Sequence, residues 1–456
     1  MAVVTGLDEY QMRLLQGMAQ VLTGRGIPLI VHANDPFAPG ASSPLLVGLL
    51  RHGRPLGVIA SATNVDAEER QLVDVVSALG LPFVRVGASV PGTVCVHGDN
   101  ITGMRALMAH LLDERRARRI VLVRGIPHQM DSMERERVFR DELASRGIPM
   151  DERLVVDGGF THEQSYVVVR DLLGRYRDMD AVVAFNDLSA LGAIGALADE
   201  GLRVPEDVAV TGFDNDQTAL HWPGLTTVDQ DLERQGQAAA VALLGFVEGR
   251  PPEEDNVVPS RLIIRGSTAP RGMPATRELG DAISMARAAQ TQLAAQDAVL
   301  GMNRAMSRCH DLDQVVEALA SRLARLGVNR CFLATLELEH GPGGAMTRRA
   351  RLVLAYHHHR VRAFPEATFP PEQLLPDELF HELREGALVL QPLTMIDREL
   401  GYVLFEPTRG MATVAEVLRM DLSRTLDGVA STLELTDHAA TLERLVAQRT
   451  EELESA

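Results

Sequence analysis

Residues 181–215 have the sequence AVVAFNDLSALGAIGALADEGLRVPEDVAVTGFDN. The apolar run Ala181–Phe185 predicts a buried strand, the spacing over residues 188–200 predicts a helix that ends at Gly201, and Val208–Phe213 predicts a second strand. Both strands are apolar on both faces, which is typical of a parallel sheet covered by helices on each side. Polar residues follow each strand directly: they are Asn186 and Asp187 after the first, and Asp214, Asn215 and Asp216 after the second.

The same alternation of strand and helix patterns extends over residues 1–268. It predicts an α/β fold with more elements than one compact sheet needs, so we expect two doubly wound parallel sheets side by side. Further strands are expected at 2–5, 27–31, 58–60, 83–86, 120–123 and 154–156, and further helices at 9–24, 68–79, 102–112, 134–145 and 163–173.

The composition excludes several classes of protein. The chain has 456 residues and a net charge of −17, which gives no overall basic field for nucleic acid or an anionic membrane. It contains no lysine, so a P-loop NTPase, a protein kinase and a pyridoxal enzyme are all excluded. Three isolated cysteines, no apolar run near 18 residues and no secretory leader predict a cytoplasmic protein without a membrane segment.

Polar side chains at the carboxyl ends of the predicted strands form the candidate site, because open α/β sheets bind ligands at that edge. Carboxylates, amides and one arginine can hydrogen-bond vicinal hydroxyls or a nitrogenous ring, and an aromatic face can cover C–H groups. Each residue alone could instead be a helix cap or a turn residue. Asn34 and Asp35 also follow a predicted strand. The candidate ligand-binding residues are Asp8, Tyr10, Ser61, Asn64, Arg135, Phe160, Asn186 and Asp214.

Several stretches resemble the effector-binding domain of the LacI/GalR family, which shares the fold of type I periplasmic sugar-binding proteins. They are VHGDNITGMRALMAHLL (96–112), AVVAFNDLSALGA (181–193), GLRVPEDVAVTGFDN (201–215), LTTV (225–228) and VPSRLIIRGST (258–268).

The resemblance implies two lobes, 1–117 with 229–251 and 118–228 with 252–268, joined by crossings near residues 117, 229 and 252. It implies that Arg135, Asn186 and Asp214 hold ligand oxygens and that Phe160 replaces an aromatic stacking residue. Val138 departs from the family, which has glycine there. The family also carries a helix-turn-helix headpiece, whereas the first strand here begins within a residue or two of Met1, so we expect no DNA contact through such an element.

The remaining sequence predicts a linker and connecting helix at 269–306, with Ala286, Leu293 and Leu300 seven residues apart. Residues 307–436 predict an α+β domain. DLDQVVEALASRLARLGVNRCFLA (311–334) and LGYVLFE (400–406) resemble a GAF domain, and LVAQRTEEL (445–453) is similar to the signalling helices that precede output domains. We therefore expect a coiled-coil helix at 437–456.

These features predict a cytoplasmic sensor that binds a sugar-like or nucleoside-like effector and relays lobe closure to a homodimeric output or a partner protein, in transcription or signal transduction. No cofactor is expected. His357, His358 and His359 are not expected to bind metal, because adjacent strand residues point to opposite faces. Two alternatives remain: a solute-binding protein of a transport system, and an enzyme that would use carboxylates such as Asp8, Asp187 and Asp214.

Overall fold

A computed structural model shows that the chain folds into two compact units. Unit 1 consists of residues 1–26 and 56–293, and unit 2 consists of residues 27–55 and 294–456. The structure describes residues 1–34, 43–61, 66–87, 89–220, 224–250, 252–269, 290, 293, 297, 299–340, 346–364, 368–395, 398–408 and 411–454. Of the predicted linker at 269–274, only Ala269 is described. Ala286 of the proposed heptad and Asp35 lie outside the described residues.

The first lobe of unit 1 has a parallel sheet in the order β11-β5-β4-β3-β1. Helices α1 and α8 pack so closely that a Cβ atom at Gly236 would lie 2.0 Å from the carbonyl oxygen of Leu14, and one at Gly17 would lie 1.9 Å from that of Glu233. Only glycine fits at these two positions. The elements are β1 (Ala2–Val4), α1 (Glu9–Thr23), β3 (Val58–Ser61), α3 (Asp66–Ala78), β4 (Phe83–Val86), β5 (Val94–Gly98), α8 (Leu232–Val247) and β11 (Asp255–Val258).

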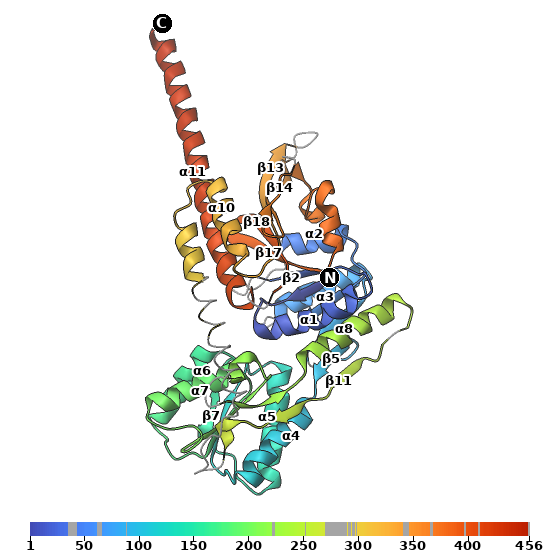
Figure 1. The fold of residues 1–456 in the computed structure, drawn as a ribbon, viewed down its shortest axis with the longest axis vertical. Helices are drawn as coiled ribbons and strands as arrows, with labels where there is room; N and C mark the ends of the chain where they lie inside the picture. The colour runs from blue at the N-terminus through green and yellow to red at the C-terminus, as the bar shows by residue number, and fades with distance from the viewer. Residues whose placement is uncertain are drawn as a thin grey trace. The chain divides into compact units, whose positions relative to one another are not determined.

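The second lobe of unit 1 has a sheet in the order β12-β10-β9-β8-β6-β7, in which only β12 is antiparallel to its neighbour. Apolar side chains of α4 and α5 pack on one face of this sheet and those of α6 and α7 on the other. This is the predicted doubly wound arrangement (Figure 1). The elements are α4 (Asn100–Ala109), β6 (Ile120–Arg124), α5 (Met130–Ser145), β7 (Val155–Asp157), α6 (His162–Leu173), β8 (Ala181–Ala184), α7 (Asp187–Asp199), β9 (Ala209–Phe213), β10 (Thr226–Asp229) and β12 (Arg261–Ile263).

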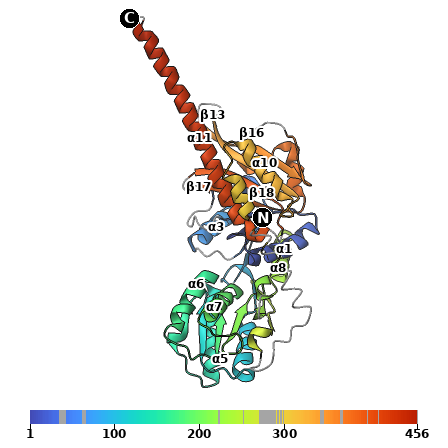
Figure 2. The same cartoon turned by 60° about the vertical axis from the view of Figure 1, so that its left-hand side comes forward.

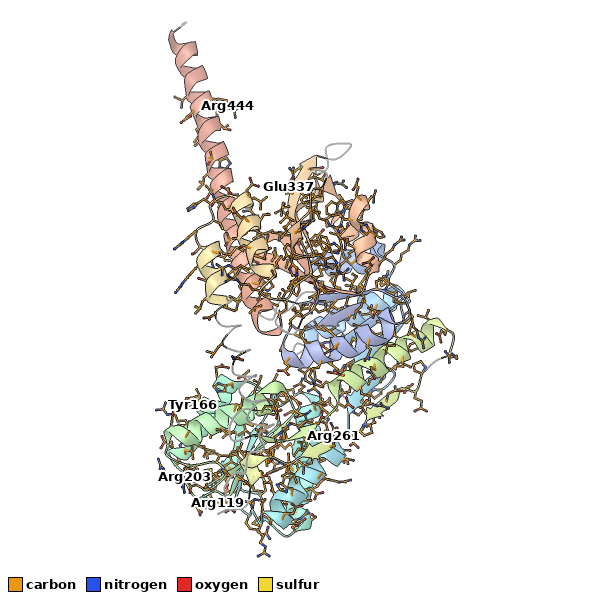
Figure 3. The ribbon with its side chains drawn as sticks, viewed as in Figure 1. Arg119, Tyr166, Arg203, Arg261, Glu337 and Arg444 are labelled. Carbon is orange, nitrogen blue, oxygen red and sulfur yellow. The ribbon has the colours of Figure 1, made fainter. Side chains whose placement is uncertain are left out.

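The chain passes between the lobes three times, and two of the crossings differ from the expected positions. The first lies between β5 and α4, near residue 99 rather than 117, because Met104, Leu107 and Leu111 pack in the core of the second lobe. The second lies between β10 and α8, close to the expected residue 229. The third lies between β11 and β12, after residue 258 rather than near 252, because β11 pairs with β5. Arg261, labelled in Figure 3, follows this crossing directly.

Unit 2 is built on a sheet in the order β2-β17-β18-β13-β14-β15, with β16 paired to β14. Every pairing is antiparallel except that of β2 with β17. Helices α10 and α11 pack against this sheet, and α2 packs on the short helix η5 (Figure 1). The elements are β2 (Leu29–Ala33), α2 (Pro44–His52), α10 (Leu312–Leu323), β13 (Arg330–His340), β14 (Met346–His357), β15 (Arg360–Val361), β16 (Thr368–Phe369), η5 (Pro371–Gln373), η6 (Asp377–Arg384), β17 (Ala387–Met395), β18 (Arg398–Phe405) and α11 (Met411–Glu454).

Helix α11 is continuous from Met411 to Glu454, so it spans the end of the predicted 307–436 domain and most of the helix expected at 437–456. Its first part buries Val414, Leu418, Leu422 and Leu426 in unit 2. Between Leu435 and Val446 the apolar side chains that the structure describes are exposed. Figures 1 and 2 show the C-terminal part of α11 extending beyond the labelled elements of unit 2. No helix in the described part of the chain is long and apolar enough to cross a membrane.

Candidate functional site

Arg135 is the central cation of the candidate site. It lies on α5, only 4% exposed, with its guanidinium carbon 3.8 Å from the centre of the Phe213 ring. Nε donates to Asn100 Oδ1 at 2.9 Å and Nη1 donates to the carbonyl oxygen of Phe185 at 2.5 Å. Both acceptors are uncharged, and among the described residues Nη2 has no hydrogen-bond acceptor. The arginine is thus fixed in place with its charge still available to a ligand.

Asp214 directly follows β9 and faces Arg135. Its φ of 105° is unusual for a residue other than glycine. Oδ1 accepts a 2.5 Å hydrogen bond from Gln230 Nε2. Burial raises the pKa of the Asp214 carboxyl to about 7, against the opposing charge of Arg135. The side chain is therefore close to half ionised near neutral pH.

Two residues of the first lobe face this pair. Burial raises the pKa of the Tyr10 hydroxyl well above its usual value, and the charges of Asp131, Asp214, Arg135 and Asp8 all act on it. Asp8 caps α1 by accepting a 2.8 Å hydrogen bond from the Gln11 N–H. Asp8 as a whole residue is exposed, but surrounding protein partly shields its carboxyl from water. This desolvation raises the pKa of the Asp8 carboxyl, and the nearby charge of Asp216 raises it further. The structure thus brings Asp8, Tyr10, Arg135 and Asp214 together from both lobes.

Asn186 and Phe160 lie beside each other at the same edge of the second sheet. Asn186 caps α7 through its Oδ1, which accepts from the Ser189 N–H at 2.9 Å, and its Nδ2 donates to the Phe160 carbonyl oxygen at 2.9 Å. Phe160 has a φ of 62°, and its ring leaves no room for a Cβ atom at Gly125. Asn186 therefore serves the fold as well as the site, and one amide hydrogen remains for a ligand.

Asp187 is fully buried and belongs to the framework of the site. Its Oδ1 accepts from the Thr227 hydroxyl at 2.6 Å and its Oδ2 accepts from the Asp216 N–H at 2.9 Å. Burial and the neighbouring charges of Asp216 and Asp214 raise its pKa well above the usual value. These bonds tie the loop after β9 to the start of α7 and so position Asp214.

The remaining predicted residues are less well placed. Ser61 ends β3, is buried, and has a hydroxyl without a hydrogen-bond partner among the described residues. No contact links it to Arg135 or Asp214. Asn64 lies outside the described residues. Asn34 follows β2, which belongs to unit 2.

Three residues of the site were not predicted from the sequence. Asn100 donates to Asp131 and Glu134 at 2.8 and 3.0 Å while it holds Arg135. Gln230 bonds Asp214, and Arg13 on α1 donates to the carbonyl oxygens of Asp214 and Asn215 at 3.1 and 3.0 Å. Asn100 lies in the VHGDN stretch, which was a usable signal. No local sequence signal points to Arg13, because its partners Asp214 and Asn215 are about two hundred residues away. None points to Gln230, because its contact with Asp214 depends on the fold.

The described residues contain no group of three histidine, cysteine or acidic side chains arranged to hold a metal ion. His357 ends β14, and His358 and His359 follow it in a turn with φ of 45° and 65°. None of the three cysteines, all of which the structure describes, forms a disulfide bond.

Comparison with known proteins agrees with the geometry of unit 1. A family model described as a periplasmic binding protein-like domain matches residues 108–268. The HTH-type transcriptional regulator CelR of Thermobifida fusca is 32% identical over 260 residues, which cover 56% of this chain and 74% of CelR. MalR of Streptomyces coelicolor, also an HTH-type transcriptional regulator, is 32% identical over 267 residues, which cover 56% of this chain and 76% of MalR.

Solved structures show the same relationship. The structure of a transcriptional regulator CelR–cellobiose complex matches with a TM-score of 0.52 at 30% identity, covering 58% of this chain and 83% of that one. A LacI family transcriptional regulator from Mycobacterium smegmatis matches with a TM-score of 0.53 at 26% identity, covering 59% and 99%. The chain belongs to the LacI family. This LacI-family protein has the two-lobed, periplasmic-binding-protein-like effector domain, and the relatives named above are transcriptional regulators.

Proposed function

We propose that this LacI-family protein senses a small polar molecule, sugar-like or nucleoside-like, bound between the lobes of unit 1. The observation that carries the proposal is the contact of α1 with the loop after β9, where Arg13 donates to the Asp214 carbonyl oxygen at 3.1 Å. Asp8 and Tyr10 of the first lobe lie at the start of the same helix, and the charges of Arg135 and Asp214 act on the Tyr10 hydroxyl. Carboxylate, phenol and guanidinium groups together can accept from and donate to neighbouring hydroxyls. Phe160 and Asn186 extend this surface, and Ser61 and Asn64 complete the proposed contact set.

Binding would favour the conformation in which both lobes contact the ligand, because a ligand shifts an equilibrium only by its differential affinity for the two states. The names of the relatives support a regulatory role: CelR and MalR are called transcriptional regulators, and one CelR structure is a complex with cellobiose. We therefore propose control of transcription or of a signalling partner, in the cytoplasm, rather than transport or catalysis.

We propose that unit 2 is a GAF-like relay module. The helix at residues 299–306 buries Met302 and Met306 in unit 2. Asn303 Nδ2 donates to Asp421 Oδ1 of α11 at 3.1 Å. Val299 and Met302 of this helix line a small apolar cavity together with Val414 and Leu418 of α11. The two helices therefore share one apolar contact surface.

The output we propose is a homodimer formed through the exposed part of α11. Leu435, Leu442, Leu445 and Val446 are each more than half exposed. Leu435 and Leu442 are one heptad apart, and Leu445 and Val446 follow one turn later, which is the spacing of a coiled-coil seam. Arg444, labelled in Figure 3, lies between these residues in the sequence. Exposed apolar stripes of this kind mark helix-pairing surfaces.

The effector proposal is tested by thermal unfolding of the full chain with a panel that includes cellobiose, other sugars and nucleosides. A compound at 100 times its Kd should stabilise the wild type by about 2.7 kcal/mol, which is a shift of several degrees. Asp214→Asn keeps the shape of the side chain and should lose most of that shift. Asp207→Asn, at the surface pair with Arg203, should keep it. Equal stabilisation of wild type and Asp214→Asn would rule out the proposed site.

The dimer proposal is tested by light scattering coupled to size exclusion. Leu442→Asp places a charge in the proposed seam and should shift the protein from dimer to monomer without changing its thermal midpoint. Leu338→Asp changes an equally exposed leucine on β13 and should leave the dimer intact. A monomeric wild type, or a dimer unaffected by Leu442→Asp, would contradict the coiled-coil proposal.

A further inference from the structure

Arg13 belongs to the first lobe of unit 1, but its guanidinium bonds the second lobe. Nη1 donates to the carbonyl oxygens of Asp214 and Asn215 at 3.1 and 3.0 Å. Nη2 lies 3.7 Å from Asp229 Oδ1, and the side chains of Arg13 and Asp229 are only 19% and 7% exposed. Because solvent screens a partly buried ion pair less than a surface pair, the two charges attract each other effectively. One side chain thus spans the boundary between the lobes.

The helix that carries Arg13 is fixed to the rest of the first lobe. A Cβ atom at Gly17 would lie 1.9 Å from the Glu233 carbonyl oxygen, so α1 and α8 touch through their backbones. Further along the same two helices, Gln237 Nε2 donates to Gln20 Oε1 at 2.7 Å. Close-packed helices do not slide freely past each other, so Arg13 moves with the first lobe as a whole.

The carbonyl oxygens that Arg13 bonds are fixed to the second lobe in the same way. Asn215 Oδ1 accepts a 2.7 Å hydrogen bond from Arg265 Nη2. The Asp216 N–H donates to Asp187 Oδ2 at 2.9 Å, at the start of α7. The loop after β9 is therefore held from both sides, and the Asp214 and Asn215 carbonyl oxygens move with the second lobe.

Asp229, the anionic partner of Arg13, lies where the chain crosses between the lobes. It ends β10 and is 5% exposed. Its Oδ2 accepts from Arg261 Nη2 at 3.0 Å, and Arg261 follows the third crossing. Its Oδ1 accepts from the N–H of Asp231, which has a φ of 49° and caps α8. Hinge segments absorb the backbone rotations of domain motion, so a carboxylate that bonds two crossings opposes that motion.

We propose that Arg13 and Asp229 form an inter-lobe latch, which holds the two lobes together before any effector binds and thereby strengthens effector binding without contacting the effector. The second part rests on the proposed function, because it takes the effector site to lie between the lobes. Apparent affinity falls with the fraction of protein in the binding conformation, so release of the inter-lobe latch raises the apparent Kd. Arg13 and Asp229 are positioning residues, separate from the proposed contact set.

The inter-lobe latch is tested without effector by double electron–electron resonance on the full chain. Nitroxide labels are placed at Val241→Cys on α8 and Val167→Cys on α6, since both side chains are more than half exposed and the helices belong to different lobes. Cys309→Ser removes the partly exposed thiol, whereas Cys95 and Cys331 are fully buried. Labelled chains are diluted into unlabelled ones, so that distances within one chain are measured.

Arg13→Met keeps a long side chain on α1 but removes the bonds to the second lobe. We expect a single narrow distance in the parent protein and a distribution about twofold broader in Arg13→Met. Arg25→Met is the matched control, because Arg25 follows α1 but pairs with Glu248 of the same lobe, and its distribution should stay narrow. A narrow distribution in Arg13→Met, or equal broadening in Arg25→Met, would overturn the inter-lobe latch.

Arg13→Lys separates the loss of the cation from a disturbance of helix packing. Lysine keeps the charge opposite Asp229 but cannot bond both carbonyl oxygens with a planar fork, so we expect a width between those of the parent protein and Arg13→Met. A distribution in Arg13→Lys as broad as in Arg13→Met would contradict the role of the charge.

The link to effector binding is tested with any compound that stabilises the wild type in the thermal panel. Such a compound should bind Arg13→Met about tenfold more weakly and should narrow its distance distribution. Equal affinity for wild type and Arg13→Met would overturn this link. If no compound in the panel stabilises the wild type, the effector proposal fails, whereas the label distances measured without effector still decide whether the inter-lobe latch exists.

Discussion

Arg135 of unit 1 and Arg330 of unit 2 are both buried, and their charges are used in opposite ways. Arg135 of unit 1 is held by an amide oxygen and a backbone carbonyl oxygen, and its charge faces the candidate site. Arg330 of unit 2 is similarly buried, but it donates to the Glu382 carbonyl oxygen at 3.1 Å and pairs with Glu406 Oε1 at 3.5 Å. Neutral acceptors position a cation without neutralising its charge, whereas a carboxylate partner neutralises it. Burial alone therefore does not identify a binding residue; the charge of its partners does.

The largest expected effect comes from breaking the unit 2 pair. Glu382 is 2% exposed and faces Arg330, Arg362, His357 and His381 at 3.6–3.9 Å. Arg330→Met would leave this buried carboxylate without its buried partner, so we expect a loss of about 3–5 kcal/mol of stability in urea unfolding. A loss below 1 kcal/mol would show that the two flanking histidines and Arg362 compensate for the missing charge.

Arg135→Met should cost less, about 1–3 kcal/mol, because it leaves two unpaired neutral acceptors and the Asp214 carboxyl, which can take up a proton when the charge of Arg135 is removed. The same variant should abolish the thermal shift produced by any compound that stabilises the wild type. Arg137→Met is the control on the same helix, since Arg137 pairs only with the exposed Asp141. If Arg135→Met were the more destabilising of the two buried-arginine variants, the contrast between the units would be wrong.

Asp214 makes the stability of unit 1 depend on pH. Its folded pKa is about 7, above the usual value of 3.8, so the folded protein binds more protons than the unfolded chain between these limits. Stability should therefore be greatest at the acidic end and fall as the pH rises from about 4 to 7. Comparison of wild type with Asp214→Asn by urea unfolding at several pH values isolates this slope. An identical slope in both proteins would contradict the raised pKa.

The smallest effect is expected at the surface of unit 2. Arg351 and Glu337 pair across β14 and β13 at 2.9 Å with both side chains more than one third exposed. Arg351→Ala should change stability by less than about 1 kcal/mol, because solvent screens exposed pairs. A larger loss in low-salt urea unfolding would show that exposed and buried pairs contribute alike, which would remove the basis of the comparison.

The fold of unit 1 was largely predictable, because buried parallel strands appear in the sequence as continuous apolar runs between helical patterns. Helix α7 and strands β8 and β9 lie within about two residues of their predicted positions. The same pattern led to the candidate site, since parallel strands end at one edge of a sheet and Asn186 and Asp214 each follow such a strand. The role of these residues in ligand binding stays a prediction. Helix α8 and strand β5 were missed.

Other features depend on partners that local patterns do not encode. The crossing after β5 was misplaced because the apolar face of α4 could pack in either lobe. Its packing against Phe139 and Leu122 assigns α4 to the second lobe, and local sequence does not encode that contact. The membership of β2 in unit 2 was not foreseen, because an apolar run such as LIVHA fits a parallel pairing with any neighbour. Arg13 is one polar residue among several on α1, and its role depends on a loop about two hundred residues away.

The pairing of β2 with β17 also constrains how this protein could have been assembled or could be recombined. A breakpoint anywhere between residues 56 and 293 would separate the two strands. A gene fragment that encoded only the C-terminal part would produce a sheet with a bare, apolar edge at β17, which is a template for self-association.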